Sequence, residues 1–399
     1  MPKIFPLKGQ IQNYAWGGQQ FIPDLLGLTS EDGPYAEYWL GAHANSPSRV
    51  IHNSEEVNLD QFINENIEKT LGERVASEFG RLPFLFKVLD VKDMLSIQVH
   101  PSKKEAEKGF ARENDEGIAL DAANRNYKDD NHKPEIMVAL SEFWLLHGFL
   151  PREQMTEILT TTPELNFLID IFQQEGYFGL YKSVMLQSDE ERSKRLQPLL
   201  SRILPLYHAG KLDKSSPDYW AAKAAITFEN EVPDRGIYSI YFSNIVRLET
   251  GQAIFQDAGV PHAYLEGQNM ELMANSDNVL RGGLTPKHVD VDELLKHVIF
   301  KETYPEIMSG EVQPDRLEKI YKSPAPDFEL SKIDLNSQDV YQANSSTVAI
   351  IMVLSGEVLL KEGIEKIGLT RGEAAFIVAN SDYKIECIDP TTIFKAAVP

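Results

Sequence analysis

The feature that most constrains the fold is the order of strand-like and helix-like patterns along the chain. Apolar and polar residues alternate with period two in parts of residues 82–100, and strand character returns at 237–265 and 328–398. Residues 151–230 carry helix signals instead, including Ser188 followed three residues later by Glu191, a typical helix start. We therefore expect a mainly β protein with an all-α insert.

Three other segments have patterns of their own. Residues 58–79 have the apolar spacing of an amphipathic helix, and a helix is also expected within 286–300. Residues 102–131 are polar throughout, which predicts a short helix followed by a long surface loop. Loops of this length are more often functional lids than idle connectors.

An internal repeat links two of the strand regions. The segment GQAIFQDAGVPHAYLE, from Gly251, aligns with GEAAFIVANSDYKIEC, from Gly372, and places His262 opposite Tyr383. Glycine-bounded hairpins of this kind indicate two related β-domains, one with a site and one without. Chance similarity between two hairpins is the alternative.

Composition narrows the partners and the compartment. The chain has 399 residues, enough for two to three domains, and its 60 acidic against 39 basic residues give a net charge of −21. Such a charge repels nucleic acid and anionic membrane surfaces. No apolar run approaches the roughly 18 residues of a membrane span, and no signal peptide is evident. We expect a cytoplasmic protein with neither kind of partner. The single cysteine, Cys387, excludes an internal disulfide and a multi-thiolate zinc site.

Polar residues share one face of a predicted strand in LSIQVHP, residues 95–101. Ser96, Gln98 and His100 alternate with apolar residues, so all three point to the same side. A solvated outer face is the bland interpretation of this pattern. In NYKDDNHKPEIMVAL, Lys133 and Glu135 lie two residues apart where an apolar strand begins, and a surface ion pair would explain them equally well.

A third stretch, AGVPHAYLEG, places His262 and Tyr264 on one face after a turn. Alone, such a histidine is more often a satisfied core residue than a ligand. Taken together, however, the three stretches supply two imidazoles, one carboxylate and one amide oxygen, which suffice for a tetrahedral divalent metal. That set consists of Gln98, His100, Glu135 and His262.

A fourth stretch, ELMANSDNVLRGGLTPKH, offers charged groups for a substrate. Arg281 and Lys287 flank a Gly-Gly pair, and arginine and lysine beside a glycine turn can hold a phosphate. A charged loop before the next helix is the alternative. Neither a phosphate-binding loop, a dinucleotide fingerprint nor a Gly-x-Ser-x-Gly nucleophile turn occurs in the sequence, so neither a nucleotide cofactor nor a serine nucleophile has support.

These residues resemble the type I mannose-6-phosphate isomerases, a cupin family. The likeness covers most of the chain, in QNYAWGG at 12–18, FLFKVLDVKDMLSIQVHPSK at 84–103, NYKDDNHKPEIMVAL at 126–140 and GVPHAYLEGQNMELMANSDNVLRGGLTPKH at 259–288. The resemblance implies a catalytic cupin domain (residues 1–150 and 231–300), a helical insert (151–230) and a C-terminal cupin-like domain without metal ligands (301–399). Gln98, where other cupins carry a second histidine, argues against an iron oxygenase.

The resemblance also implies roles for individual residues. One zinc ion per chain would be bound by Gln98, His100, Glu135 and His262. Catalytic roles fall to Arg281, Lys133, Asp277 and Glu271. Contacts with the sugar phosphate fall to Ser96, Tyr264, Lys287 and Trp16.

The implied reaction is the reversible isomerisation of D-mannose 6-phosphate to D-fructose 6-phosphate through a cis-enediol, with zinc polarising the sugar carbonyl. Asp277, Glu271 and Lys133 are all candidates for the acid or base. The alternatives are a cupin that binds sugar without catalysis and an isomerase of another sugar phosphate, with glucose 6-phosphate the obvious rival. We expect a monomer that acts in mannose metabolism and GDP-mannose biosynthesis.

Overall fold

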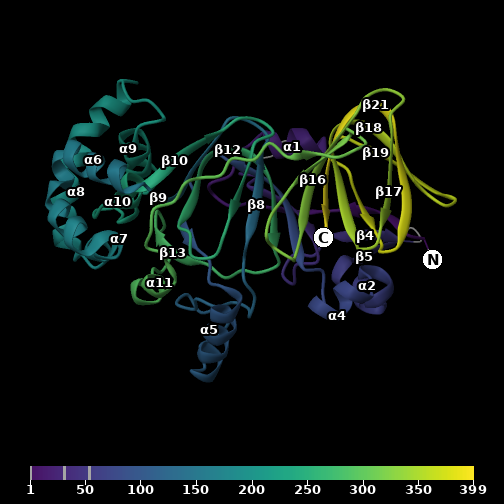
Figure 1. Ribbon diagram of the computed structural model, residues 1–399, viewed down its shortest axis with the longest axis horizontal. Helices are drawn as coiled ribbons and strands as arrows, with labels where there is room; N and C mark the ends of the chain where they lie inside the picture. Colours follow the sequence, from purple (N-terminus) through teal and green to yellow (C-terminus); the bar gives the residue numbers. More distant parts are fainter. Residues whose placement is uncertain (1, 30–32, 53–54) are drawn as a thin grey trace.

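The computed structural model describes residues 2–29, 33–52 and 55–399 of the chain. Two β regions lie side by side along its long axis, and a group of helices closes one end (Figure 1). The expectation of a mainly β protein with a helical insert is confirmed. No helix in the described ranges is long and apolar enough to cross a membrane.

The first β region is a ten-stranded sheet within the described part of the chain. Its strands are β2 (Gln10–Gln12), β3 (Glu37–Gly41), β6 (Phe84–Val91), β7 (Ile97–Val99), β8 (Glu135–Ala139), β9 (Phe143–Phe149), β10 (Ser243–Leu248), β11 (Ala253–Gln256), β12 (His262–Ala274) and β13 (Leu280–Gly283). The long strand β12 pairs with β6, β7, β8 and β9, so it connects most of the sheet.

Strand β6 shows how period-two alternation separates core from cavity. All eight of its residues are buried. Phe84, Phe86 and Val88 belong to a hydrophobic core shared with the second sheet, whereas Lys87 and Leu89 point to the other face and line a small cavity. Since successive side chains of a strand point to opposite faces, a charged residue in this apolar run reaches the interior of the first β region.

The register of β12 brings distant segments together. His262, at its start, pairs with Gln98 of β7 and with His147 of β9. The His147 side chain contacts that of Gln256 on β11, which pairs with Glu135 of β8. All these pairings are antiparallel. Side chains that the sequence places on three separate strands therefore meet on one face of the sheet.

The second β region is an eleven-stranded sheet, again counted over the described residues. Its strands are β1 (Ile4–Lys8), β4 (Arg49–His52), β5 (Glu55–Asn58), β14 (Glu311–Val312), β15 (Glu318–Tyr321), β16 (Glu329–Leu335), β17 (Val340–Ser345), β18 (Ala349–Glu362), β19 (Glu365–Thr370), β20 (Ala374–Ile377) and β21 (Ser381–Ala397). The expected strand character of residues 328–398 is confirmed, and strands β18 and β21 are 14 and 17 residues long.

The N-terminal strands contribute to this second sheet. Strand β1 pairs with β20, with Ile4 opposite Ile377, and continues through β4 to β5. Ile4, Phe5 and Leu7 are buried by this pairing. Part of the region expected in the first domain thus extends the C-terminal sheet.

The internal repeat has a structural counterpart, although not as two hairpins. Strands β11 and β20 begin at the aligned residues Ala253 and Ala374, and the preceding Gly251 and Gly372 have positive φ of 87° and 85°. However, β11 pairs with β8, whereas β20 pairs with β1 and β18. The expectation of two-strand hairpins is therefore wrong, because each short strand pairs with other strands instead of with the long strand that follows it.

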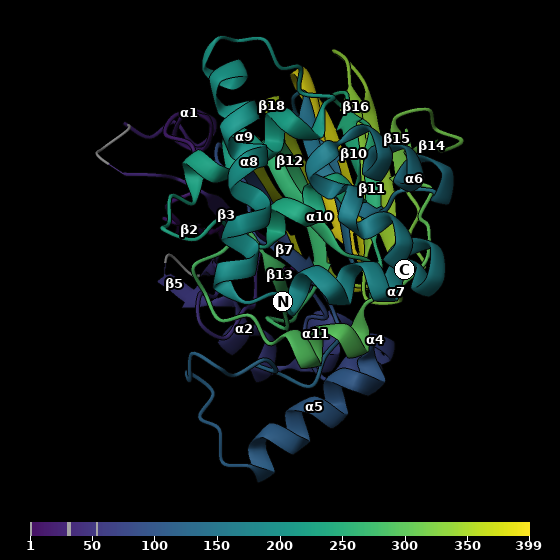
Figure 2. The ribbon, with the colours of Figure 1, turned by 90° about the vertical axis from the view of Figure 1, so that its left-hand side faces the viewer.

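The helices form three groups according to their position in the structure. The short helices near the second sheet are α1 (Phe21–Leu26), α2 (Leu59–Glu65), α3 (Ile67–Leu71) and α4 (Glu73–Phe79). Those near the site are α5 (Lys103–Asp115) and α11 (Val291–His297). The terminal group in Figure 2 is α6 (Arg152–Thr161), η1 (Pro163–Leu168), α7 (Ile169–Met185), α8 (Asp189–His208), α9 (Pro217–Thr227) and α10 (Gly236–Phe242).

The helix start predicted at Ser188 in the insert is confirmed. Helix α8 begins after Ser188, whose hydroxyl accepts from the Glu191 amide while Glu191 accepts from the Ser188 amide, so the predicted capping box is confirmed. The helices pack their apolar residues on the outer face of β9, where Trp144, Leu146 and Phe149 join the same core.

Two secondary-structure expectations were wrong. Residues 58–79 form three short helices because the backbone leaves helical geometry at Asn66 and at Gly72, which has φ 90°. Residues 237–242 were expected in a strand but belong to α10, every residue of which is buried. Tertiary packing overrides the strand propensity of this Ile- and Tyr-rich segment.

Candidate metal centre and its cavity

A compact cluster of three potential metal ligands lies where β7, β8 and β12 meet. His100 Nε2 is 3.5 Å from Glu135 Oε1, and His262 Nε2 is 3.3 Å from Glu135 Oε2. All three side chains are buried, and their ligand atoms lie within 4.8 Å of one another. The two imidazole rings are 5.0 Å apart between centroids.

Backbone carbonyls orient both imidazoles toward the cluster. The Nδ1 atom of His100 lies 2.8 Å from the Asn278 carbonyl oxygen, and that of His262 lies 2.9 Å from the Val260 carbonyl oxygen. A proton on each Nδ1 would donate to these oxygens and leave Nε2 with its lone pair toward the cluster. Both Nε2 atoms are buried and have no hydrogen-bond partner among the residues that the structure describes. This donor set fits a divalent cation.

The electrostatics also favour the protonation states that bind metals. Burial, followed by the charge of Lys133, lowers the pKa of His100 to about 4. Burial alone would raise the pKa of Glu135, but the charge of Lys133, followed by the contact with His100, holds it well below its usual range. At neutral pH the cluster therefore offers a neutral His100 imidazole and a carboxylate, as metal binding requires.

Gln98 and Lys133 lie beside the cluster. Gln98 faces His262 across the strand pair and lines the same cavity as Glu135. The Lys133 ammonium is 2.9 Å from Glu135 Oε1. All four residues predicted as ligands therefore come together, and Lys133 reaches the same carboxylate.

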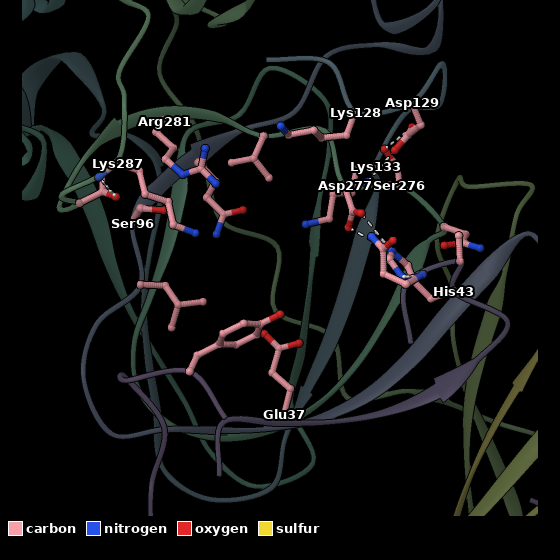
Figure 3. Close-up of a pocket in the computed structure, with 18 of the residues that line it drawn as sticks. Glu37, His43, Ser96, Lys128, Asp129, Lys133, Ser276, Asp277, Arg281 and Lys287 are labelled. Atoms are coloured by element: carbon pink, nitrogen blue, oxygen red, sulfur yellow. Dashed lines mark hydrogen bonds and ion pairs between the residues drawn. The ribbon is translucent and has the colours of Figure 1, made fainter. Parts of the chain in front are cut away.

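A large cavity opens above the cluster. Its volume is about 1400 Å³, and Gln98 and Lys133 line both this cavity and a second one of about 50 Å³ that reaches Glu135 and His262. Figure 3 shows Ser96, Arg281 and Lys287 on one wall and Lys133 and Asp277 on the other. Trp16 also lines the large cavity.

Three cations face this cavity without forming an ion pair to any described carboxylate. They are Lys128, Arg281 and Lys287. Burial lowers the pKa of Arg281, and burial followed by the charges of Arg281 and Lys128 lowers that of Lys287. In a chain with net charge −21, such a cluster can attract an anionic group locally.

On the opposite wall, Asp277 lies within hydrogen-bond distance of a histidine. His43 Nε2 is 3.1 Å from Asp277 Oδ2, and the Asp277 side chain is 42% exposed. Burial would raise the pKa of Asp277, but its contact with His43 keeps it below the usual value. Asp277 is thus an ionised carboxylate that faces the cavity at neutral pH.

Glu271 and Tyr264 are buried in the small cavity and do not line the large one. The sequence alone does not indicate this difference in depth. Tyr264 donates to Glu271 Oε1 at 2.8 Å, and Lys87 lies 3.3 Å from Glu271 Oε2 and 3.4 Å from Glu37 Oε2. All of them line the small cavity and not the large one, apart from Glu37, which lines both. Burial and the charge of Glu135 raise the pKa of Glu271, whereas Lys87 lowers it.

Several cavity residues were not predicted from the sequence. Lys87 and Glu37 lie on buried strands, where charged residues in apolar runs were a usable signal. Lys128 and His43 lie in irregular segments next to predicted elements, and no periodicity marks them. Their proximity depends on how distant segments meet.

The fold and site define a class: a mainly β protein with a buried His-Glu-His cluster that can hold a metal at the base of a cationic cavity. Residues 4–152 match the family model of the phosphomannose isomerase type I catalytic domain. The chain is similar to the mannose-6-phosphate isomerases of Salmonella typhimurium and Homo sapiens, with 39% identity covering 94% of each chain and 33% identity covering 99% of this chain and 98% of the human one. It therefore belongs to the type I phosphomannose isomerase family.

Solved structures agree with this assignment over the full length. A zinc-bound mannose 6-phosphate isomerase matches with a TM-score of 0.89 and 34% identity, and covers 100% of both chains. The Salmonella typhimurium enzyme bound to fructose 6-phosphate and zinc matches with the same TM-score, identity and coverage.

Proposed function

We propose that this chain is a mannose-6-phosphate isomerase that interconverts D-mannose 6-phosphate and D-fructose 6-phosphate. One zinc ion per chain would be held by Gln98, His100, Glu135 and His262. The observation that carries the proposal is the pair of imidazole nitrogens that face Glu135 without a hydrogen-bond partner in the described part of the chain. They lie at the base of a cavity lined by three cations that form no ion pair with a described carboxylate. Relatives with this reaction in their names, and one structure containing zinc and the ketose, support it.

The cationic wall supplies binding and charge stabilisation. Lys287 and Ser96 lie on the same wall as Arg281 (Figure 3), a suitable place for the phosphate of the substrate. We assign Arg281 to the sugar oxygens that gain negative charge during the reaction, because its planar guanidinium can donate two parallel hydrogen bonds. Trp16 would close the cavity against the sugar, and Tyr264 would support its floor.

Proton transfer between carbon 2 and carbon 1 needs a group that faces the sugar from one side. Asp277 is ionised, faces the large cavity and lies beside Lys133 in Figure 3. We therefore favour Asp277 as the base and Lys133 as a cation near the reacting oxygens. Glu271 is the other carboxylate candidate, and its pairing with Tyr264 and Lys87 suits a role in shaping the floor. When bound, zinc would supply a Lewis acid that polarises the carbonyl oxygen.

The two carboxylates are separable by isotope exchange. In deuterated water, D277N should lose both turnover and exchange of the carbon 2 proton, whereas E271Q should retain measurable exchange. The opposite result would assign the base to Glu271. Mass spectrometry of the recovered sugar phosphate measures this directly.

A coupled assay for fructose 6-phosphate tests the function itself. We expect turnover of mannose 6-phosphate that is lost after chelation and restored by zinc. Turnover of glucose 6-phosphate alone would support the rival isomerase, and sugar binding without any turnover would support a binding protein.

We further propose a division of labour within the chain. The catalytic unit would be the cupin domain of residues 1–150 and 231–300, closed by the insert of residues 151–230. Residues 301–399, whose sheet is extended by β1, β4 and β5, would form a cupin-like domain without metal ligands. We propose that the enzyme is a cytoplasmic monomer that serves mannose metabolism and the supply of GDP-mannose.

A further inference from the structure

The segment that carries Arg281 and Lys287 has an uncommon backbone. Gly283 has φ 125°, and Leu284, which follows it, has φ 55°. Positive φ is rare for a residue with a side chain, so surrounding groups must hold Leu284 in this conformation. Arg281 precedes this bend by three residues and Lys287 follows it by three, so the bend sets how the two cations are placed relative to each other.

One side chain, Asp234, binds the backbone of the bend. Its Oδ1 accepts from the Leu284 amide at 2.6 Å, and its Oδ2 accepts from the Thr285 amide at 3.3 Å. Oδ1 also accepts from the Gly236 amide at 2.7 Å. Asp234 lies between α9 and α10, at the end of the helical region. A carboxylate that precedes α10 thus binds the backbone at the end of β13, between Arg281 and Lys287.

The backbones of the bend and of residues 234–236 approach each other so closely that neither Gly283 nor Gly236 could carry a side chain. A Cβ on Gly283 would lie 2.5 Å from the Gly236 Cα and 2.8 Å from Asp234 Oδ1, and a Cβ on Gly236 would lie 2.6 Å from the Leu284 amide nitrogen. Helix α10 packs on β13, and Figure 2 shows the two close together next to α11. Leu284 and Thr285 line the large cavity, as do Thr227 and Phe228 at the end of α9.

We propose that Asp234 is a positioning residue: by binding the amides of Leu284 and Thr285 it fixes the segment that presents Arg281 and Lys287 to the phosphate of the substrate. The inference rests on the proposed function and gives the connection between α9 and α10 a part in substrate binding. Asp234 itself need not touch the substrate. Its loss would free the bend at the end of β13, whereas β13 itself stays paired with β7, so the metal cluster would keep its geometry.

The effect of removing the carboxylate follows from this separation. Without Asp234 the two amides lose a charged acceptor and Leu284 loses the contact that holds its left-handed conformation. The two cations would then sample several relative positions, and binding of an anion would have to order them. Binding therefore weakens more than the chemical step does.

The test compares D234A, D234N and a matched control, D315A. Asp315 Oδ1 also accepts two backbone amides, from Leu317 at 2.9 Å and Glu318 at 3.2 Å, beside a positive-φ residue, Arg316. It lies outside the described lining of the cavity. For D234A we expect KM for mannose 6-phosphate to rise about tenfold with kcat within about threefold of the wild type, and for D315A both to stay within about twofold.

Two readouts do not depend on turnover. Affinity for inorganic phosphate, measured by calorimetry, should fall by about tenfold in D234A, and amide hydrogen exchange of peptides covering 280–290 should accelerate in D234A but not in D315A. D234N keeps an oxygen that can accept from the Leu284 amide but loses the negative charge. Its KM should therefore be closer to the wild-type value than to that of D234A. If D234A does not fold, D234N decides the inference. Its KM and its amide exchange should both exceed the wild-type values, with a rise in KM smaller than about tenfold.

Some outcomes would overturn the inference. Unchanged KM, phosphate affinity and exchange in D234A would remove Asp234 from substrate binding, and an equal loss of kcat in D234A and D234N would point to a different role. If the wild-type protein fails to isomerise mannose 6-phosphate, the proposed function is wrong, whereas phosphate affinity and exchange still decide the role of Asp234.

Discussion

Replacement of Arg281 by alanine tests the cationic wall most sharply. The side chain lies partly buried in the cavity without an ion pair to any described residue, so its charge is available to a ligand. Two unit charges about 4 Å apart attract by about 4 kcal/mol at an effective dielectric constant of about 20. Lys128 and Lys287 remain in the variant and compensate in part, so a net loss of about 2.7 kcal/mol is expected, which corresponds to about 10²-fold in kcat/KM.

The assay couples fructose 6-phosphate formation to a dehydrogenase and compares R281A with R247A. Arg247, on β10, is 49% exposed and pairs with Glu142 and Glu249, so its removal should leave kcat/KM within about twofold. A mainly kcat effect in R281A would indicate a contact that strengthens in the transition state, and a mainly KM effect would indicate ground-state binding. A kcat/KM for R281A within about threefold of the wild type would refute the assignment.

Three further predictions concern the metal, pH and stability. E135Q should weaken zinc binding by at least about 10²-fold in competition with a chelator, because the amide lacks the charge that Glu135 offers between the two histidines; equal affinity would remove it from the ligand set. Burial would raise the pKa of Glu293, but hydrogen bonds from Lys296, Tyr127 and Arg112 lower it to about 2, below its ordinary 4.5. The ionised carboxylate therefore stabilises the fold above about pH 4.5, and this contribution is lost as the pH falls toward 2. The difference in Tm between wild type and E293Q should therefore shrink on acidification, and a constant difference would contradict it. S188A should lose about 1 kcal/mol of stability from the capping box of α8, and an unchanged Tm would contradict that.

The ligand cluster was predictable because its signals are local. Alternation in residues 95–100 places Gln98 and His100 on one face, and two-residue spacing does the same for Lys133 and Glu135. Strand pairing then decides whether these faces meet, and the pairings of β12 with β7 and β9 and of β11 with β8 bring them together. The donor chemistry of three stretches combined these residues into one ligand set, and the family resemblance then added roles for the residues of the fourth stretch.

Other features depend on contacts that no local pattern records. Asp234 matters through two amides about fifty residues further along the chain, at Leu284 and Thr285. The buried helix α10 has the composition of a strand, and only its packing between the insert and β13 makes it helical. Strand β1 joins the C-terminal sheet because Ile4, Phe5 and Leu7 bury against strands near the other end of the chain.

The most direct test of the central claim is anomalous diffraction at the zinc edge from crystals of the zinc-loaded protein. We predict one strong peak per chain, within bonding distance of His100 Nε2, His262 Nε2, the Glu135 carboxylate and the Gln98 amide oxygen. Absence of a peak there, or a peak bound by other side chains, would contradict the account.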